Sequence, residues 1–462
     1  MSMETKRVAA SRRDFLRWTA LAGGACALPR ALWAAGAPGA PGAPSRPRPN
    51  IVYILTDDFG WSDLHVYGRD VVDTPNLDRL AAEGLRFTNA YAACPVCSPT
   101  RASIMTGKYP ARLHLTDYIP GRPQANTKLL LPDWTKTLTP EHVTVAQALQ
   151  AAGYATAIVG KWHLECDPLQ RGFDEGFVLT KGSPPAGMPR VAEEQTDAAV
   201  AFIEKNRARP FFCYLAYNAV HAPLSPRPEL REKYAARADG KAKPGPDYFA
   251  VVEEMDRGVG RVLAKLDELG LAENTLVVFM SDNGGFSGTT SNAPLRLAKG
   301  WLYEGGVRVP LIVRWPGVVK PGTRSDAPVS SIDHFPTIAE AAGLTAPAAV
   351  DGVSLVPLLR DGRAPDREAI YWHYPHYHAG PPSSAVRAGD WKLIEFLEDR
   401  RVELHDLKSD PSEANDLAAA QPAKAEELRA LLNRWREAVG AQMPAPNPDY
   451  DPAKSQRRPA AG

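Results

Sequence analysis

The chain has 462 residues, of which 44% are hydrophobic and 23% are charged, as in an ordinary globular protein. Its 54 Lys and Arg residues nearly balance 53 Asp and Glu residues, so the formal net charge is +1 and no basic surface for nucleic acid is indicated. This composition excludes collagen, a coiled coil, a disordered chain and a multi-span membrane protein. The length predicts one large domain or two unequal domains.

The amino terminus carries the pattern of an export signal. Arg12 and Arg13 precede an apolar stretch at residues 18–28, and residues 35–37 offer an Ala-x-Ala type of cleavage site. A proline ends the stretch well short of the roughly 20 residues that span a membrane, so no transmembrane segment is expected in the mature chain. We therefore expect residues 1–37 to be a Tat-type signal peptide, read by the Tat export machinery, and the protein to be periplasmic or secreted. The alternative is a Sec signal in which the two arginines are an ordinary basic region.

From residue 50 to about residue 365, apolar strand-like runs alternate with amphipathic helical segments. This alternation predicts an α/β fold with a mostly parallel sheet between helices. The first run is apolar throughout, as in a strand that is buried on both faces. The expected strands are residues 50–56, 155–159, 211–217, 275–281 and 309–314, and the expected helices are residues 74–84, 144–153 and 248–269.

The pattern changes after about residue 365. Short strand-like segments at residues 384–388, 391–396 and 401–407 are separated by tight turns, which predicts an antiparallel meander, and an amphipathic helix is expected at residues 423–439. The expected organisation is a Pro/Gly/Ala linker at 38–49, a catalytic domain at 50–365, a smaller C-terminal subdomain of antiparallel sheet plus helix at 366–441, and a disordered Pro-rich tail at 442–462.

Polar side chains follow four of the predicted strands at the point where each strand ends. They are Asp57 and Asp58, then Lys161 and His163, then His221, then Asp282 and Asn283. In open α/β sheets, ligands bind just beyond the carboxyl ends of the strands. The three carboxylates and the amide would form an oxygen-rich pocket that suits Ca²⁺ or Mg²⁺. A single Asp after a strand is more often a helix cap, but two clusters at separate strand ends favour a metal site.

The densest chemical signal is the segment from Cys94 to Arg101. Pro99 fits the first turn of a helix, which places Cys97 at the helix amino terminus, where backbone N–H groups favour anions. Arg101 would lie on the same helix face as Cys97. The segment also contains a C-x-x-C pair, a redox or half-zinc pattern, but zinc is disfavoured because the chain has no second such pair.

The string Cys97-Ser98-Pro99-Thr100-Arg101 has the form C-x-P-x-R and resembles the motif of the type I sulfatases of the alkaline-phosphatase-like superfamily. The resemblance runs from about residue 50 to residue 417 and rests on five segments in order, which makes it specific. These segments are residues 57–60, 97–101, 160–163, 281–284 and 299–308. Glu165 departs from the family pattern, in which Gly is common at that position.

The resemblance implies the alkaline-phosphatase-like fold, a divalent cation and a modified cysteine. By resemblance, a formylglycine-generating maturation enzyme converts Cys97 to Cα-formylglycine, whose hydrate supplies a metal-bound hydroxyl that attacks sulfur. Metal coordination lowers the pKa of that hydroxyl. The implied ligands of Ca²⁺, or alternatively Mg²⁺, are Asp57, Asp58, Asp282, Asn283 and position 97.

The remaining roles are also implied by resemblance. His163 would be the base that expels sulfate from the enzyme, and Arg101 would hold the formylglycine. Lys161, Lys299 and His221 would bind sulfate oxygens, and the last two are both candidates to protonate the leaving alcohol. The expected substrate is a sulfate ester of a carbohydrate, with aryl sulfates as surrogates.

Three other functions remain open at this stage. A phosphate or phosphonate ester hydrolase could use the same fold, although phosphate-cleaving relatives usually carry Ser or Thr at position 97. A glycan-binding protein would not need every catalytic position intact. A C-x-x-C oxidoreductase leaves the carboxylate clusters unexplained.

Some conspicuous residues have plainer interpretations. The histidine-rich segment 373–378 is predicted to be a pocket-lining loop rather than a metal site, because no carboxylate accompanies it and a proline interrupts it. Trp61, Trp134 and Trp301 fit either a substrate pocket or the core. The cysteines expected to remain buried thiols are Cys166 and Cys213.

Overall fold

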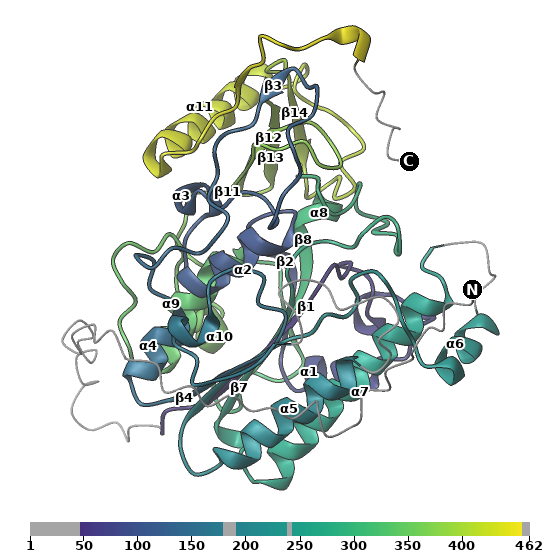
Figure 1. Cartoon of the computed structure of the whole chain (residues 1–462), viewed down its shortest axis with the longest axis vertical. Coiled ribbons are helices and arrows are strands. Elements are labelled where there is room, and N and C mark those ends of the chain that lie inside the picture. The colour runs from purple at the N-terminus through teal and green to yellow at the C-terminus, as the bar shows by residue number, and fades with distance from the viewer. Residues whose placement is uncertain (1–46, 179–190, 238–242, 455–462) are drawn as a thin grey trace, which may run out of the picture.

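The computed structural model describes residues 47–178, 191–237 and 243–454 (Figure 1). The predicted signal peptide and residues 38–46 of the predicted linker lie outside the described residues. The last linker residues pack on the body of the protein: Asn274 Nδ2 donates to the carbonyl of Arg48 at 3.1 Å, and the Tyr154 hydroxyl donates to that of Pro49 at 3.1 Å. Within the described ranges, no helix is both long enough and apolar enough to span a bilayer.

The larger sheet has nine strands in the order β10-β2-β8-β7-β1-β6-β4-β5, with β9 also paired to β2. In the described part of the chain, β8 runs antiparallel to β7 and β2, and the other pairings in this sheet are parallel. The predicted α/β fold with a mostly parallel sheet is confirmed. The strands are β1 (Asn50–Thr56), β2 (Leu85–Tyr91), β4 (Ala155–Gly160), β5 (Glu175–Phe177), β6 (Phe211–Ala216), β7 (Thr275–Ser281), β8 (Arg308–Arg314), β9 (Thr323–Ser325) and β10 (Val329–Ser330).

Strand β1 lies in the middle of this sheet and is buried on both faces, as its apolar run predicts. Ile51 and Tyr53 point into the core on one face, and Val52 and Ile54 point into the core on the other. Helices cover both faces (Figure 1). One face carries α1 (Pro75–Ala82), α5 (Val191–Lys205), α6 (Pro228–Ala235) and α7 (Pro246–Glu268), and the other carries α2 (Cys97–Thr106), α4 (Val145–Ala151), α9 (His334–Ala341) and α10 (Val356–Asp361).

Helix α7 shows why these segments fold as the periodicity predicts. Its apolar residues recur every three or four positions, so they form one face that packs on the sheet. Each fully buried side chain of this kind stabilises the fold by about 1.5–3 kcal/mol. The buried apolar positions expected from the pattern are Val252, Met255, Val259, Val262 and Leu266, all with no exposed surface.

The smaller C-terminal unit is an antiparallel sheet, β11-β12-β13-β14, that packs against α11 (Figure 1). The predicted meander and helix are therefore present, preceded by β11, which the sequence pattern did not indicate. Leu428 and Leu432 of α11 are buried against this sheet. The elements are β11 (Ile370–Tyr374), β12 (Ser383–Ala388), β13 (Trp391–Phe396), β14 (Val402–Asp406) and α11 (Pro422–Val439); α3 (Pro110–Leu113) and α8 (Glu304–Val307) lie near the junction with the larger sheet.

The structure differs from the predicted disordered tail over residues 442–454. Strand β15 (Ala445–Pro446) pairs antiparallel with β3 (Leu129–Leu130), and Asn447 Nδ2 donates to the carbonyl of Thr127 at 2.8 Å. Proline is tolerated here because the pair is a short two-stranded edge. Composition alone predicts disorder, whereas Thr127 and Asn126, which bond the tail, lie more than 300 residues away from it in the chain. Residues 455–462 of the predicted tail lie outside the described residues.

The histidine-rich segment also differs from its prediction as a single pocket-lining loop. His373 belongs to β11 and is buried, with Nδ1 2.8 Å from Ser384 Oγ and Nε2 2.9 Å from the carbonyl of Gln442. His376 is buried as well, with Nε2 2.8 Å from Thr116 Oγ1. Both rings are buried and hydrogen-bonded inside the protein, so they are interior residues.

Candidate active site

Carboxylates at the ends of β1 and β7 converge on the amino terminus of α2. Asp57, Asp58 and Asp282 are at most 1% exposed, and so are Cys97 and Arg101. Strands β1 and β7 are parallel neighbours, with Thr56 opposite Ser281, so the residues that follow them meet at one edge of the sheet. The convergence predicted from the strand ends is present.

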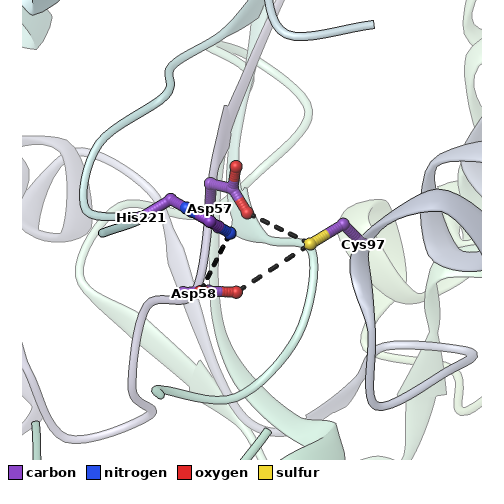
Figure 2. Close-up of side chains that lie close together, drawn as sticks. All are labelled: Asp57, Asp58, Cys97 and His221. Carbon is purple, nitrogen blue, oxygen red and sulfur yellow. Dashed lines mark hydrogen bonds and ion pairs between the residues drawn. The ribbon is translucent and has the colours of Figure 1, made fainter. Parts of the chain in front are cut away.

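The sulfur of Cys97 points toward the two carboxylates that follow β1 (Figure 2). Its Sγ is 3.4 Å from Asp57 Oδ1, 3.9 Å from Asp58 Oδ1 and 3.6 Å from Lys299 Nζ. Helix α2 begins at Cys97 and has Pro99 in its first turn, as predicted. Burial, and then the charge of Asp57, raise the pKa of the Cys97 thiol well above its usual value.

Arg101 is fully buried beneath the site. Its Nε and Nη2 lie 2.9 and 2.8 Å from Asp282 Oδ2, and its Nη1 donates to the carbonyl of Lys161 at 2.6 Å. These contacts fix Asp282 and the end of β4. Burial, and then the neighbouring charge of Asp57, raise the pKa of Asp282 to about 6. Burial opposes ionisation of Asp57 too, but Lys161 and other cations nearby hold its pKa well below the usual range.

The lysines and the histidine expected to bind sulfate all contact the carboxylates. Lys161 Nζ is 2.5 Å from Asp57 Oδ2, and Lys299 Nζ is 2.6 Å from Asp58 Oδ1. His221 Nε2 is 3.6 Å from Asp58 Oδ2 (Figure 2). The site therefore combines three carboxylates with permanent cations at hydrogen-bond distance.

His163 follows β4 and has a positive φ of 58°, which is uncommon for a residue other than glycine. Its Nε2 donates to the carbonyl of Ile119 at 2.5 Å, so Nδ1 carries the lone pair of the neutral ring. Nδ1 is buried and has no hydrogen-bond partner within the described residues. Burial, and then the charge of Lys161, lower the pKa of His163 to about 3. The ring is thus a neutral acceptor, although the structure shows no hydrogen bond between it and Cys97 in the described ranges.

The donor set fits a hard divalent cation. Asn283 Nδ2 donates to Asp58 Oδ1 at 2.9 Å, while Asn283 Oδ1 is buried without a hydrogen-bond partner in the described part of the chain. An orphaned buried oxygen is costly, and a bound cation would satisfy it. Ligand atoms of Asp57, Asp58, Cys97 and His221 lie within 4.8 Å of one another. Oxygen donors of this kind match Ca²⁺ or Mg²⁺.

Asp63 is a supporting residue that sequence reasoning missed. Its Oδ2 accepts from Tyr248 Oη at 2.6 Å, from Thr290 Oγ1 at 2.8 Å and from the backbone N–H of Gly60 at 3.2 Å. These bonds tie the loop after β1 to the loop after β7. Asp63 follows the Asp57-Asp58 motif closely, but only the fold shows that distant donors surround it.

Family comparisons agree with this geometry. The model described as Sulfatase matches residues 49–344, and the model described as N-sulphoglucosamine sulphohydrolase, C-terminal, matches residues 296–438. The chain belongs to the sulfatase family, whose named members are sulfuric ester hydrolases. The resemblance and the fold expected from it are confirmed.

Several relatives are named for sulfatase activity. A sulfatase of Formosa agariphila is 32% identical, over 82% of this chain and 86% of the relative. The human N-acetylgalactosamine-6-sulfatase is 36% identical, over 73% of this chain and 69% of the relative. Among solved structures, BT4656 in complex with its substrate D-glucosamine-2-N,6-O-disulfate aligns with a TM-score of 0.72 and 28% identity, covering 88% of this chain and all of the other.

Proposed function

We propose that this sulfatase hydrolyses a sulfate monoester of a carbohydrate and that the reacting group is a formylglycine formed from Cys97. The observation that carries the proposal is the position of Cys97, at the start of α2 and within 4 Å of Asp57, Asp58 and Lys299. A residue there can contact a cation and an anionic group at once. The relatives support a sulfate ester over the phosphate or phosphonate alternative.

Asp57, Asp58, Asp282 and Asn283, together with position 97, would hold the cation, with Ca²⁺ preferred to Mg²⁺. The orphaned amide oxygen of Asn283 and the clustered carboxylates support this assignment. When bound, such a cation lowers the pKa of a coordinated hydroxyl and polarises an ester oxygen. His221 lies within the same cluster, so it is close enough to contact either the cation or the sulfate group.

The remaining side chains would bind and orient the ester and move protons. Lys161 and Lys299 supply positive charge where negative charge develops on sulfate oxygens. His163 acts as the base through Nδ1, because its other nitrogen is committed to Ile119. Lys299 and His221 both remain candidates for protonating the leaving alcohol. Arg101 holds Asp282 and the end of β4, and in this assignment it also supports the formylglycine.

The proposed substrates are 6-sulfated amino sugars within glycans. Relatives named N-acetylgalactosamine-6-sulfatase, and the complex with a sulfated glucosamine, support this class. Aryl sulfates would act as surrogate substrates, because their leaving groups need little help.

We further propose that residues 1–37 direct Tat export to the periplasm or outside the cell after conversion of Cys97 by a formylglycine-generating enzyme. The catalytic domain would span 50–365 and the C-terminal subdomain 366–441. The two family models overlap at residues 296–344, which is consistent with two units that share an extended junction.

The test is the mass and reactivity of position 97. Protein made with a competent maturation system should lose mass in the peptide bearing residue 97 and react there with aldehyde probes. Cys97→Ala should abolish turnover of N-acetylgalactosamine 6-sulfate and of an aryl sulfate while leaving the fold intact. Cys94→Ala is the matched control, since Cys94 is an equally buried thiol three residues away. Substantial turnover by Cys97→Ala, or an unmodified cysteine in fully active enzyme, would contradict the proposal.

A further inference from the structure

The segment Thr116–Ile119 lies directly against the catalytic motif. The carbonyl of Ile119 accepts the hydrogen bond from His163 Nε2, and the N–H of Ile119 donates to Ser98 Oγ at 3.1 Å. The backbone of Ile119 therefore contacts both the proposed base, His163, and Ser98, the residue next to Cys97. The position of the Ile119 carbonyl decides where the imidazole of His163 lies and which of its nitrogens is protonated.

The other side of the same segment is held by the C-terminal subdomain. The hydroxyl of Tyr374, at the end of β11, donates to Asp117 Oδ1 at 2.8 Å, and the N–H of Tyr118 donates to the same oxygen at 2.9 Å. His376 contacts Thr116 one residue earlier. Tyr374 is 1% exposed and Asp117 is 3% exposed, so water does not replace these bonds.

Burial of the Asp117 carboxyl group at this position costs free energy of folding. Burial raises the pKa of its carboxyl to about 6, in opposition to the hydrogen bonds from Tyr374 and Tyr118. Nδ1 of His376 is 3.9 Å from Asp117 Oδ2, and burial lowers the pKa of that ring to about 3, so the imidazole is neutral. A buried acid is held mainly by its hydrogen bonds, and here those bonds join the two parts of the protein.

We propose that Asp117 and Tyr374 are positioning residues that hold the carbonyl of Ile119, and through it the imidazole of His163, in the geometry needed for catalysis. The inference rests on the proposed function, because it assumes that His163 is the base. Tyr374 touches neither the reacting atoms nor the cation ligands; it acts through the segment Thr116–Ile119. The C-terminal subdomain thereby contributes to the chemical step itself.

The test removes one hydroxyl. Tyr374→Phe keeps the ring but loses the hydrogen bond to Asp117, and we expect kcat to fall roughly ten- to hundredfold with KM changed less than about twofold. Tyr371→Phe is the matched control, because it removes a hydroxyl from the same strand. The ring of residue 371 stacks on Trp435, with ring centroids 4.8 Å apart, and this contact is kept in the variant. The control variant should have the same kcat as the wild-type protein. An unchanged kcat in Tyr374→Phe, or a rise in KM alone, overturns the proposal.

A second pair of variants covers a failure of Tyr374→Phe to fold. Asp117→Asn retains an oxygen that accepts from both donors, so its kcat should stay within a few-fold of the wild type. Asp117→Ala removes the acceptor and should match the loss in Tyr374→Phe, with thermal unfolding confirming that both variants are folded. Equal activity of the Asn and Ala variants overturns the proposal.

Failure of the proposed function is recognised separately. His163→Ala should be nearly inactive if His163 is the base, and retention of its activity removes that assignment together with the inference. If His163→Ala is inactive but Tyr374→Phe is fully active, only the positioning role is wrong. ¹⁵N spectra of the histidine rings add a readout apart from activity: the His163 signal, identified by its loss in His163→Ala, should report a protonated Nε2 in the wild type and a changed tautomer mixture in Tyr374→Phe.

Discussion

Lys299 and His221 both lie close to Asp58, with side-chain distances of 2.6 and 3.6 Å. Burial opposes the charge on Lys299, but the Asp58 carboxylate more than offsets it and raises the pKa of the ammonium group above its usual value. Such a group holds its proton firmly until negative charge develops beside it. A residue that donates a proton therefore differs in its effect from one that only binds sulfate when the leaving group needs that proton.

We predict that Lys299→Ala and His221→Ala reduce turnover of a sugar sulfate by roughly 10²–10⁴-fold and turnover of an activated aryl sulfate much less. An alkoxide leaving group needs protonation, whereas a nitrophenolate does not. Steady-state kcat on both substrates provides the measurement, with the exposed Lys320→Ala as a control that should change neither. Equal losses on the two substrates would show that the residue binds sulfate without donating a proton.

His373 allows a prediction at the scale of one residue but far from the chemistry. Burial lowers the pKa of this ring from 6.5 to about 4. The unfolded state therefore binds more protons than the folded state between about pH 6.5 and pH 4. Stability is fully present above pH 6.5 and falls as the pH drops through this window, by on the order of 3 kcal/mol for this residue alone.

Urea unfolding across this pH range tests the contribution of His373. We expect His373→Gln, which keeps a donor toward the carbonyl of Gln442, to show a shallower loss of stability between pH 6.5 and pH 4 than the wild type. The same slope in both proteins would assign the acid sensitivity to other groups.

At the scale of elements, the tail strand β15 and its partner β3 carry a testable role. Residues 442–454 bond to the catalytic domain at several points, among them Asn126, whose side chain exchanges two hydrogen bonds with the backbone of Asp451. Those contacts cover the loop that follows Ile119. The tail thus closes the chain back onto the catalytic domain.

We predict that truncation after residue 441 lowers the Tm and exposes the loop around residues 122–131 to proteolysis. Each lost kcal/mol corresponds to a shift of a few degrees, about 2–4 °C for domains of a few hundred residues. Truncation after residue 454 is the matched control and should leave both properties unchanged. Proteolysis with mass spectrometry locates the cleavage, and an unchanged cleavage pattern in the shorter protein would remove the proposed role of the tail.

The strands of the protein differ in how far the sequence alone predicts them. Strands β1 and β7 were predictable because a run of apolar residues specifies a strand buried on both faces, and the polar residues that follow then converge by topology. The tail strand was not predictable, because its pairing depends on Leu129–Leu130 and not on its own composition. Asp63 and Asp117 were missed for the same reason: each looks like an ordinary loop aspartate until its distant donors are in place.

At the scale of the whole molecule, Cys97 becomes almost inaccessible once the protein has folded, with 1% of its surface exposed. In the proposed maturation, the converting enzyme needs access to the segment around residue 97, so we expect conversion to precede folding. A Tat signal carries folded protein. Together with the proposed Tat signal, this order leads us to expect conversion in the cytoplasm, before export.

We predict that replacing Arg12 and Arg13 by Lys leaves active, formylglycine-bearing enzyme in the cytoplasm. Cell fractionation combined with an aryl sulfatase assay and peptide mass analysis provides the measurement. A matched variant with Arg17 replaced by Lys retains the twin arginine and should still be exported. Undiminished export of the double variant would favour the Sec alternative.

The position of β1 in the middle of the sheet determines when the site around Cys97 can be completed during synthesis. Arg101 and Asp282, which are bonded in the finished site, are 181 residues apart in the chain. At about 5–20 residues per second, a ribosome that has just made the Cys97 motif needs roughly 10–40 s to make Asp282. Until then β1 lacks its neighbour β7, and Arg101 of the motif lacks its partner Asp282. If a maturation enzyme acts on Cys97 as proposed, the order of the strands gives it an interval of synthesis in which the site is incomplete, and slower translation between these two segments should lengthen that interval.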